Sequence, residues 1–277
     1  MAPALGHGLR VGGGVTSRGP ARAAASIARR LGLRASGERI RALTGASRDE
    51  WREIAEAFPA MPRDPGPAAA RARMRLGRRW SRALSTGRWR VRLDGDPPAP
   101  APAIYATAHI GSLQALRYAL RARGVPVAIV LGPYNQDRTR YVQDDRVFDR
   151  RYALDFPHAL PADRAHRLRS ALERGSLILA ADLPPAPSVG FAFAAFLGGR
   201  VALDSRPFRL ARAARVPCRA AFLTLPREGW TLTLSPPLSG GEAAAMEAFA
   251  RAFERVALRA PLDLDGVVYR SLARASR

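Results

Sequence analysis

Residues 104–124 read IYATAHIGSLQALRYALRARG. The first five are uncharged and mostly apolar, which predicts a buried strand over residues 104–108. Residues 112–123 then favour a helix, which Gly124 ends. His109 therefore stands at the carboxyl end of a strand, where open α/β sheets bind their ligands, and Gly111 allows a close turn into the helix.

The alternation of strands and helices continues to residue 259. It predicts strands over 125–131, 176–181, 191–196 and 216–223, an antiparallel or edge strand over 230–234, and helices over 137–151, 163–173, 204–214 and 242–259. A turn at Gly198 and Gly199 separates residues 191–196 from Val201. This order predicts the α/β class, with a mixed, mainly parallel sheet covered by helices.

Composition limits the class of protein. The chain has 277 residues, of which 47% are hydrophobic, enough for a real core. Its single cysteine, Cys218, excludes a disulfide framework and a Cys-based zinc site, and no apolar run is long enough for a conventional transmembrane helix. The net charge of +22 favours an anionic partner: nucleic acid, anionic lipid or an acidic protein. All 45 basic residues are arginine, so part of this charge reflects a compositional bias of the coding sequence.

The chain is expected to have three parts. Residues 1–35 read as a flexible basic leader, residues 36–99 as a helical, Arg-rich, membrane-proximal segment, and residues 100–277 as the α/β domain. Within the middle part, residues 68–92 hold nine arginines, two tryptophans and no acid. They fit either a packed helix with a solvated arginine face or an interfacial helix on anionic lipid.

The segment from His109 to Gln114 resembles the His-x4-acid motif of the late acyltransferases of lipid A biosynthesis, within the glycerolipid acyltransferase superfamily. Those enzymes typically read His-Phe-Gly-Asn-Trp-Glu at this place. Later segments resemble the same family in the same order: ERGSLILAADL at 173–183, the phenylalanine-rich GFAFAAFLG at 190–198, and Asn135 after the second strand. The resemblance covers roughly residues 100–260.

The resemblance implies a glycerolipid-acyltransferase-like fold and transfer of an acyl group from an acyl carrier protein or CoA thioester to a lipid or glycolipid hydroxyl. His109 matches the general base, and N–H groups at Gly111 to Leu113, Ser112 included, or a nearby arginine would stabilise the oxyanion. Asn135 matches a substrate-binding position of the family, and Asp182 could bind the acceptor or cap a loop. The arginine that the family often has just before the asparagine is absent here, and Arg138 or Arg140 could take its place. Arg200 is a further candidate for substrate binding. The resemblance also implies a peripheral place on the cytoplasmic face of the inner membrane. No cofactor, metal or nucleic acid is expected.

Gln114 departs from the family at its most important place, because it stands where the family has Glu or Asp. A glutamine oxygen can accept from the imidazole ring, but it cannot compensate imidazolium charge. Three outcomes follow: a slow enzyme, an enzyme that recruits another acid, or a non-catalytic relative that binds lipid. Topology makes four acids candidates for recruitment: Asp137, Asp144, Asp145 and Asp182.

Other features leave alternatives open. Phe191, Phe193 and Phe196 alternate at strand spacing and fit core packing better than an acyl channel. Arg200 and Arg206 could hold a phosphate or lie on a solvated face. Charge alone suggests nucleic-acid binding, but no recognised nucleic-acid module accompanies it.

Overall fold

The computed structural model describes a large part of the chain after residue 55. The residues described are 56–60, 91–98, 102–111, 113–131, 157, 159–162, 165–182, 190–224, 230–260 and 263. All of them belong to one compact unit, which runs from Gly45 to Arg277. The expectations for residues 1–35, for the Arg-rich stretch 68–90 and for a helix over 137–151 lie outside the described residues.

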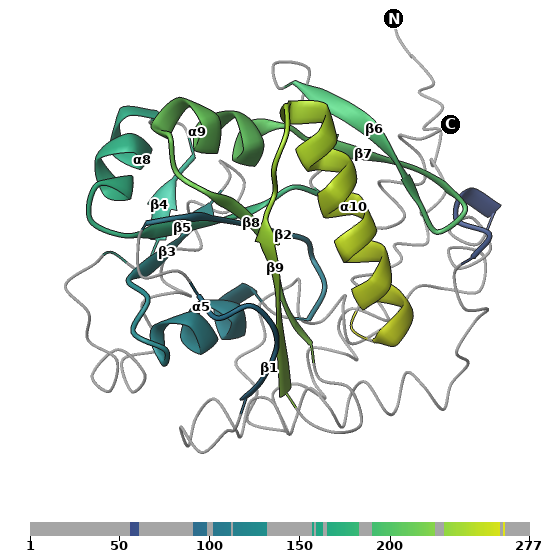
Figure 1. Ribbon diagram of the computed structural model, residues 1–277, viewed down its shortest axis with the longest axis horizontal. Coiled ribbons are helices and arrows are strands. Elements are labelled where there is room, and N and C mark those ends of the chain that lie inside the picture. The colour runs from purple at the N-terminus through teal and green to yellow at the C-terminus, as the bar shows by residue number, and fades with distance from the viewer. Residues whose placement is uncertain are drawn as a thin grey trace, which may run out of the picture. The chain divides into compact units, whose positions relative to one another are not determined.

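A mixed, mostly parallel sheet forms the centre of this unit (Figure 1). Among the described residues it has seven strands in the order β1 (Val91–Gly95), β9 (Trp230–Pro237), β8 (Cys218–Thr224), β2 (Ile104–Thr107), β5 (Ser176–Ala180), β3 (Val127–Leu131) and β4 (Ala159–Pro161). Every neighbouring pair is parallel except β8 with β9. The α/β class and the mainly parallel sheet predicted from the sequence are confirmed.

Helices cover both faces of the sheet. α5 (Leu113–Arg121) packs on one face, against β3 and β8. α8 (Ala165–Leu172), α9 (Arg206–Ala214) and α10 (Glu242–Arg259) pack on the other (Figure 1). The strand residues explain this arrangement, because alternate side chains of a strand point to opposite faces. In β2, Ile104 and Ala106 join the core under α8, α9 and α10, whereas Tyr105 joins the core under α5.

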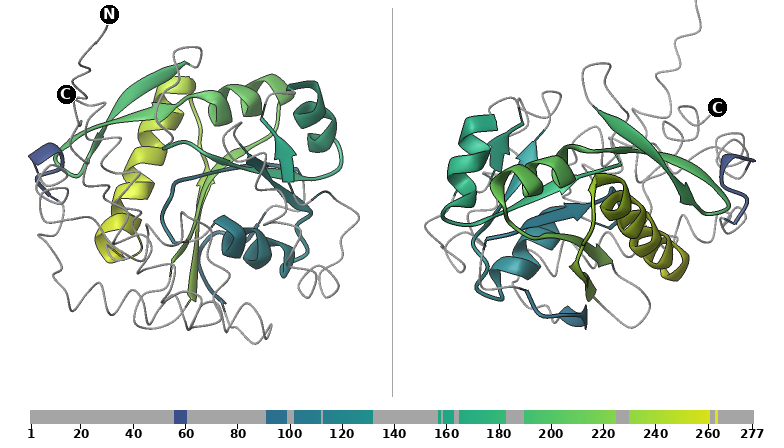
Figure 2. Two further views of the ribbon diagram at one scale, coloured as in Figure 1. Left: turned by 180° about the vertical axis from the view of Figure 1, so that it is seen from behind. Right: turned by 45° about the horizontal axis from the view of Figure 1, so that its top comes forward.

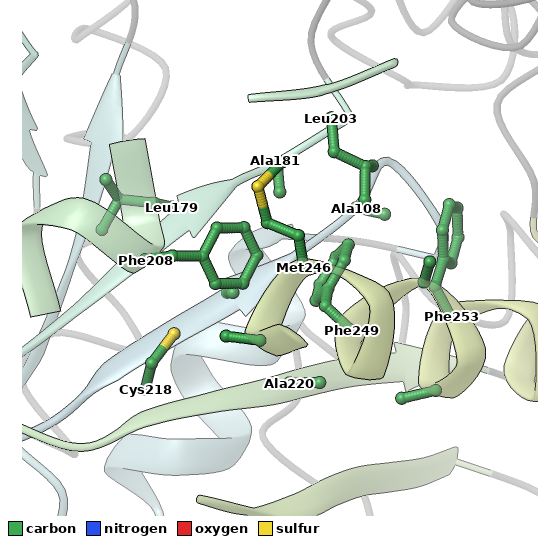
Figure 3. Close-up of a cluster of buried hydrophobic side chains, with 14 of the residues drawn as sticks. Ala108, Leu179, Ala181, Leu203, Phe208, Cys218, Ala220, Met246, Phe249 and Phe253 are labelled. Atoms are coloured by element: carbon green, nitrogen blue, oxygen red, sulfur yellow. The ribbon is translucent and has the colours of Figure 1, made fainter. Parts of the chain in front are cut away.

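A separate two-stranded hairpin lies beside α10. β6 (Phe191–Phe196) pairs antiparallel with β7 (Gly199–Asp204) across the Gly198 turn. The strand over 191–196 and the turn after it are confirmed. The inner face of the hairpin carries Phe196 into the main core, where its ring stacks on Phe253 with centroids 4.7 Å apart. Phe253 also stacks on Phe222 of β8, so one side chain of α10 links the hairpin to the sheet. Figure 3 shows Phe249 and Phe253 of α10 within this cluster of buried side chains.

Most elements match the ranges expected from the sequence, and α10 matches at both ends. β1, β4 and β7 were not predicted. β1 lies at the edge of the sheet, parallel to β9, so the sheet already begins at Val91, ahead of the expected boundary at residue 100. α9 begins at Arg206 rather than at Asp204, because Asp204 is the last residue of β7. Within the described part of the chain, no helix is both long and apolar enough to cross a membrane.

The phenylalanine cluster yields a stability prediction. Phe253→Ala removes a fully buried ring that contacts both Phe196 and Phe222. We expect it to lower the free energy of unfolding by about 3–5 kcal/mol, because a lost aromatic ring leaves a cavity that packing fills only in part. Urea unfolding measures this as a lower midpoint with an unchanged slope. The matched control is Leu258→Ala on the same helix, whose side chain is 48% exposed and which should change stability little. Equal losses in the two variants would contradict the assignment of Phe253 to the core.

Candidate functional site

His109 lies where β2 stops and the chain turns toward α5. The Ile110 N–H donates to the carbonyl of Ala108 at 2.8 Å, which closes a tight turn with His109 at its tip. The imidazole is 23% exposed, so it is reachable from solvent although most of it is covered. The sequence prediction that His109 stands at the carboxyl end of a strand is confirmed.

Asp182 lies directly beside His109, at the end of the neighbouring strand. β2 and β5 are parallel, and their register pairs Thr107 with Ala180. The Ala181 N–H donates to the Thr107 carbonyl at 2.8 Å, which carries the pairing one residue further. The same register places residue 182 level with residue 109. Two residues 73 positions apart in the chain therefore meet because their strands are neighbours.

Both oxygens of the Asp182 carboxylate bind His109. Oδ2 accepts the backbone N–H of His109 at 2.6 Å, and Oδ1 lies 2.8 Å from the ring Nδ1. The Asp182 side chain is fully buried, and a buried carboxylate needs such partners because it has lost its water. The two bonds hold both the backbone and the ring of His109 in place. This is the carboxylate in hydrogen-bond reach that an enzyme with Gln114 would have to recruit.

The pairing determines which ring nitrogen carries the proton. An ionised carboxylate can only accept hydrogen bonds, so Nδ1 must donate and must hold the proton. In the neutral ring, Nε2 then has the lone pair. That is the tautomer a general base needs, with the carboxylate placed to stabilise the imidazolium that forms when Nε2 takes a proton.

Gly111 anchors the loop on its other side. Its φ is +65°, a conformation that L side chains rarely adopt, and a Cβ there would lie 1.9 Å from the Leu223 carbonyl oxygen. Gly111 forms a bridge with Leu223 at the end of β8, and its N–H donates to the Asp263 carbonyl at 2.8 Å. The Gly111 N–H was a predicted oxyanion donor. The structure corrects this, because that N–H is already used to hold the loop.

The site sits at a point where the chain connections diverge. β2 leads into α5 on one face of the sheet, whereas the chain after β5 passes through the hairpin to α9 on the other face. In open α/β sheets such a divergence leaves a crevice outside the carboxyl ends of the two strands, and ligands bind there. His109 and Asp182 lie at the ends of these two strands.

A second buried carboxylate lies close to the ends of these strands. The Asp204 N–H donates to the Ala181 carbonyl at 2.7 Å, so the end of β7 is joined to the end of β5. The Asp204 side chain accepts from the Arg206 backbone N–H at 2.8 Å and from the Arg206 guanidinium. Asp204 is therefore neutralised by Arg206, in contrast to Asp182, which faces the imidazole. Apart from the two-residue spacing, no sequence pattern predicts this ion pair.

A cavity of about 360 Å³ opens beside Asp204. Ala180 of β5 lines it, two residues before Asp182. The charged residues of its described wall are Asp204, Arg206 and Arg209. The rest of that wall has no charge and comes from β3, β5, α8, α9 and the residues next to β4 and β6: Val130, Ala162, Ala165, Leu168, Leu179, Gly190, Pro207, Leu210 and Ala213. Pockets of this size and lining bind small or chain-like apolar ligands.

The described structure does not bring the remaining predicted site residues to the His109–Asp182 pair, called the dyad below. Arg200 is exposed on β7, where its guanidinium lies 4.9 Å from the centroid of the Phe193 ring. Ser112, Asn135 and Arg138 lie outside the described residues, as does the side chain of Gln114. Cys218 is no nucleophile for this site, since burial raises the pKa of its thiol to about 12 and keeps it protonated at neutral pH.

Comparison with known proteins adds no assignment. No protein-family model matches the sequence, and no curated protein is significantly similar to it.

The Gly111 anchor can be tested by substitution. Gly111→Ala should lower the free energy of unfolding by about 3 kcal/mol or more, because the added Cβ must push the loop away from Leu223. Gly124→Ala is the matched control: its φ of +79° is also positive, but nothing lies within 4 Å of its Cβ. The control should cost only about 1–2 kcal/mol, the penalty of the left-handed backbone. Chemical denaturation of both variants measures the difference, and equal losses would contradict the close contact.

Proposed function

We propose that the protein is an acyltransferase that moves a fatty acyl group from a carrier protein or CoA thioester to a lipid or glycolipid hydroxyl, with His109 as general base. The observation that carries the proposal is the buried carboxylate of Asp182, bound to both the backbone N–H and Nδ1 of His109. It supplies the charge that Gln114 cannot. The α/β fold, the order of the segments that resemble the lipid A acyltransferases and the place of His109 at a strand end support the same family-like reading.

In the proposed reaction His109 first accepts a proton from the acceptor hydroxyl and later donates it to the leaving group. Nε2 of His109 takes the proton of the acceptor hydroxyl as its oxygen attacks the thioester carbon. The imidazolium is stabilised by Asp182. The tetrahedral intermediate then collapses, the carbon–sulfur bond breaks, and the leaving thiolate takes the proton from Nε2. An ester and a free thiol are formed, and the histidine is neutral again.

The oxyanion of that intermediate needs hydrogen-bond donors. With the Gly111 N–H used by Asp263, the predicted set is reduced to donors that follow it in the chain. α5 begins at Leu113, and the first N–H groups of a helix have no partner within the helix. We therefore assign this role to the first turn of α5, where the helix dipole also favours negative charge.

The cavity beside Asp204 is a better candidate for the acyl chain than a channel lined by Phe191, Phe193 and Phe196, the less favoured alternative for these residues. Phe196 is fully buried in the core and Phe191 and Phe193 are exposed, so these three rings do not form one channel. The cavity is mostly apolar and reaches to Ala180, near Asp182. A basic protein surface would in turn suit an acidic carrier protein, and peripheral attachment to an anionic membrane would bring the acceptor lipid to the site.

Single substitutions in the dyad test the proposal. With an acyl carrier protein thioester and a dispersed lipid acceptor, release of carrier thiol should fall by about 10⁴-fold or more in His109→Ala. Asp182→Asn should cost about 10⁴-fold, because it removes the charge and favours the wrong tautomer. His166→Ala, at an exposed histidine of α8, is the matched control and should retain full turnover. Thiol release that is equal in His109→Ala and in wild type would overturn the role of His109.

Gln114→Glu separates the two ways of supplying a carboxylate. Since Asp182 already holds the imidazole, we expect turnover in the same assay to change by less than about threefold. A gain of several orders of magnitude would show instead that position 114 carries the acid and that Asp182 serves the loop alone. No turnover in either form would favour the lipid-binding relative.

A further inference from the structure

The outer face of the β6–β7 hairpin is apolar and basic, which is unusual for a surface exposed to water. Phe191 is 47% exposed and Phe193 is 41% exposed. The two rings contact each other edge-to-face, with centroids 5.6 Å apart. Alternate residues of a strand share a face, so both rings project from the side of β6 opposite to Phe196. The hairpin packs its other side on α10, as Figures 1 and 2 show.

An arginine lies beside these two rings. The Arg200 guanidinium lies over the Phe193 ring, 4.9 Å from its centroid. Residues 190–214 hold four arginines, and Asp204, their single acid, is buried against Arg206. The exposed part of this segment is therefore positively charged.

We propose that this face, formed by Phe191, Phe193 and Arg200, docks on the surface of an anionic lipid bilayer. Exposed aromatic rings lie at the boundary of headgroups and acyl chains, and neighbouring arginines bind lipid phosphates. The net charge of +22 disfavours a second copy of the chain as the occupant, since two such surfaces repel. An acidic protein would match the arginines but would leave the two rings unexplained.

This inference rests on the membrane attachment in the proposed function, and it assigns that attachment to a surface that the sequence did not indicate. The hairpin is the next described element after β5 in the chain. Asp204 joins the end of β7 to Ala181, next to Asp182. A bilayer on the hairpin would lie close to the crevice of the dyad. An acceptor lipid would then reach His109 without leaving the surface.

Vesicle co-sedimentation of the full chain tests the docking face. Wild type should bind vesicles of phosphatidylglycerol and phosphatidylcholine, bind pure phosphatidylcholine weakly, and lose affinity as salt is raised. The double variant F191S/F193S should bind at least about tenfold more weakly, and the single variant R200A about fivefold more weakly. L258S is the matched control, because Leu258 on α10 is equally exposed at 48% and should leave binding unchanged.

The outcomes distinguish the docking face from the acyl transfer proposed for His109. F191S/F193S should keep wild-type thiol release with a detergent-dispersed acceptor, since its rings do not contact the dyad. Vesicle binding that is unchanged both in F191S/F193S and in R200A would overturn the docking face and place attachment elsewhere in the chain. Unchanged vesicle binding together with lost binding of an acidic carrier protein would assign the face to that protein instead. Failure of wild type to bind anionic vesicles would overturn the membrane attachment itself.

Discussion

A single buried carboxylate organises the end of the sheet in this protein. Asp182 has no exposed surface, and its two oxygens accept the backbone N–H and the ring Nδ1 of one residue, His109. Burial of the charge is tolerated because both oxygens are bonded, and the bonds in turn fix the orientation and tautomer of the imidazole. The loop around this pair is held on its far side by Gly111, which only glycine can occupy against Leu223. The arrangement of β2, β5 and β8 thus determines one geometry for His109.

Much of this could be predicted from the sequence, because it depends on local patterns. The uncharged run ending at His109, the glycine after it and the helix that follows were enough to place the histidine at a strand end. The partner of His109 could not be predicted in the same way. It depends on which strand lies next to β2: this strand is β5, and β3 lies beyond it. This long-range order is not visible in the sequence, which left Asp182 as one of four possible acids. The register between β2 and β5 then places Asp182, rather than another of these acids, beside His109.

The phenylalanines show the same limit in another form. Their alternation correctly predicts a strand, and it separates neighbouring residues onto opposite faces. Phe191, Phe193 and Phe196 are not all on the same face, because Phe196 is an odd number of residues away and turns inward to stack on Phe253. The prediction of core packing is therefore confirmed for Phe196 and wrong for Phe191 and Phe193. The two outward rings lie beside Arg200, so positive charge and exposed apolar surface occur together at this place. The total net charge does not reveal this combination.

Asp182 should hold His109 in the Nδ1–H tautomer, and nitrogen-15 NMR of the histidine ring measures this without any substrate. In wild type, the neutral His109 ring should carry its proton on Nδ1. In D182N, the backbone N–H of His109 still needs an acceptor, so the amide oxygen takes that place and the amide NH₂ faces Nδ1. The proton should then move to Nε2. A proton on Nε2 in neutral wild type, or the same tautomer in both proteins, would contradict the account.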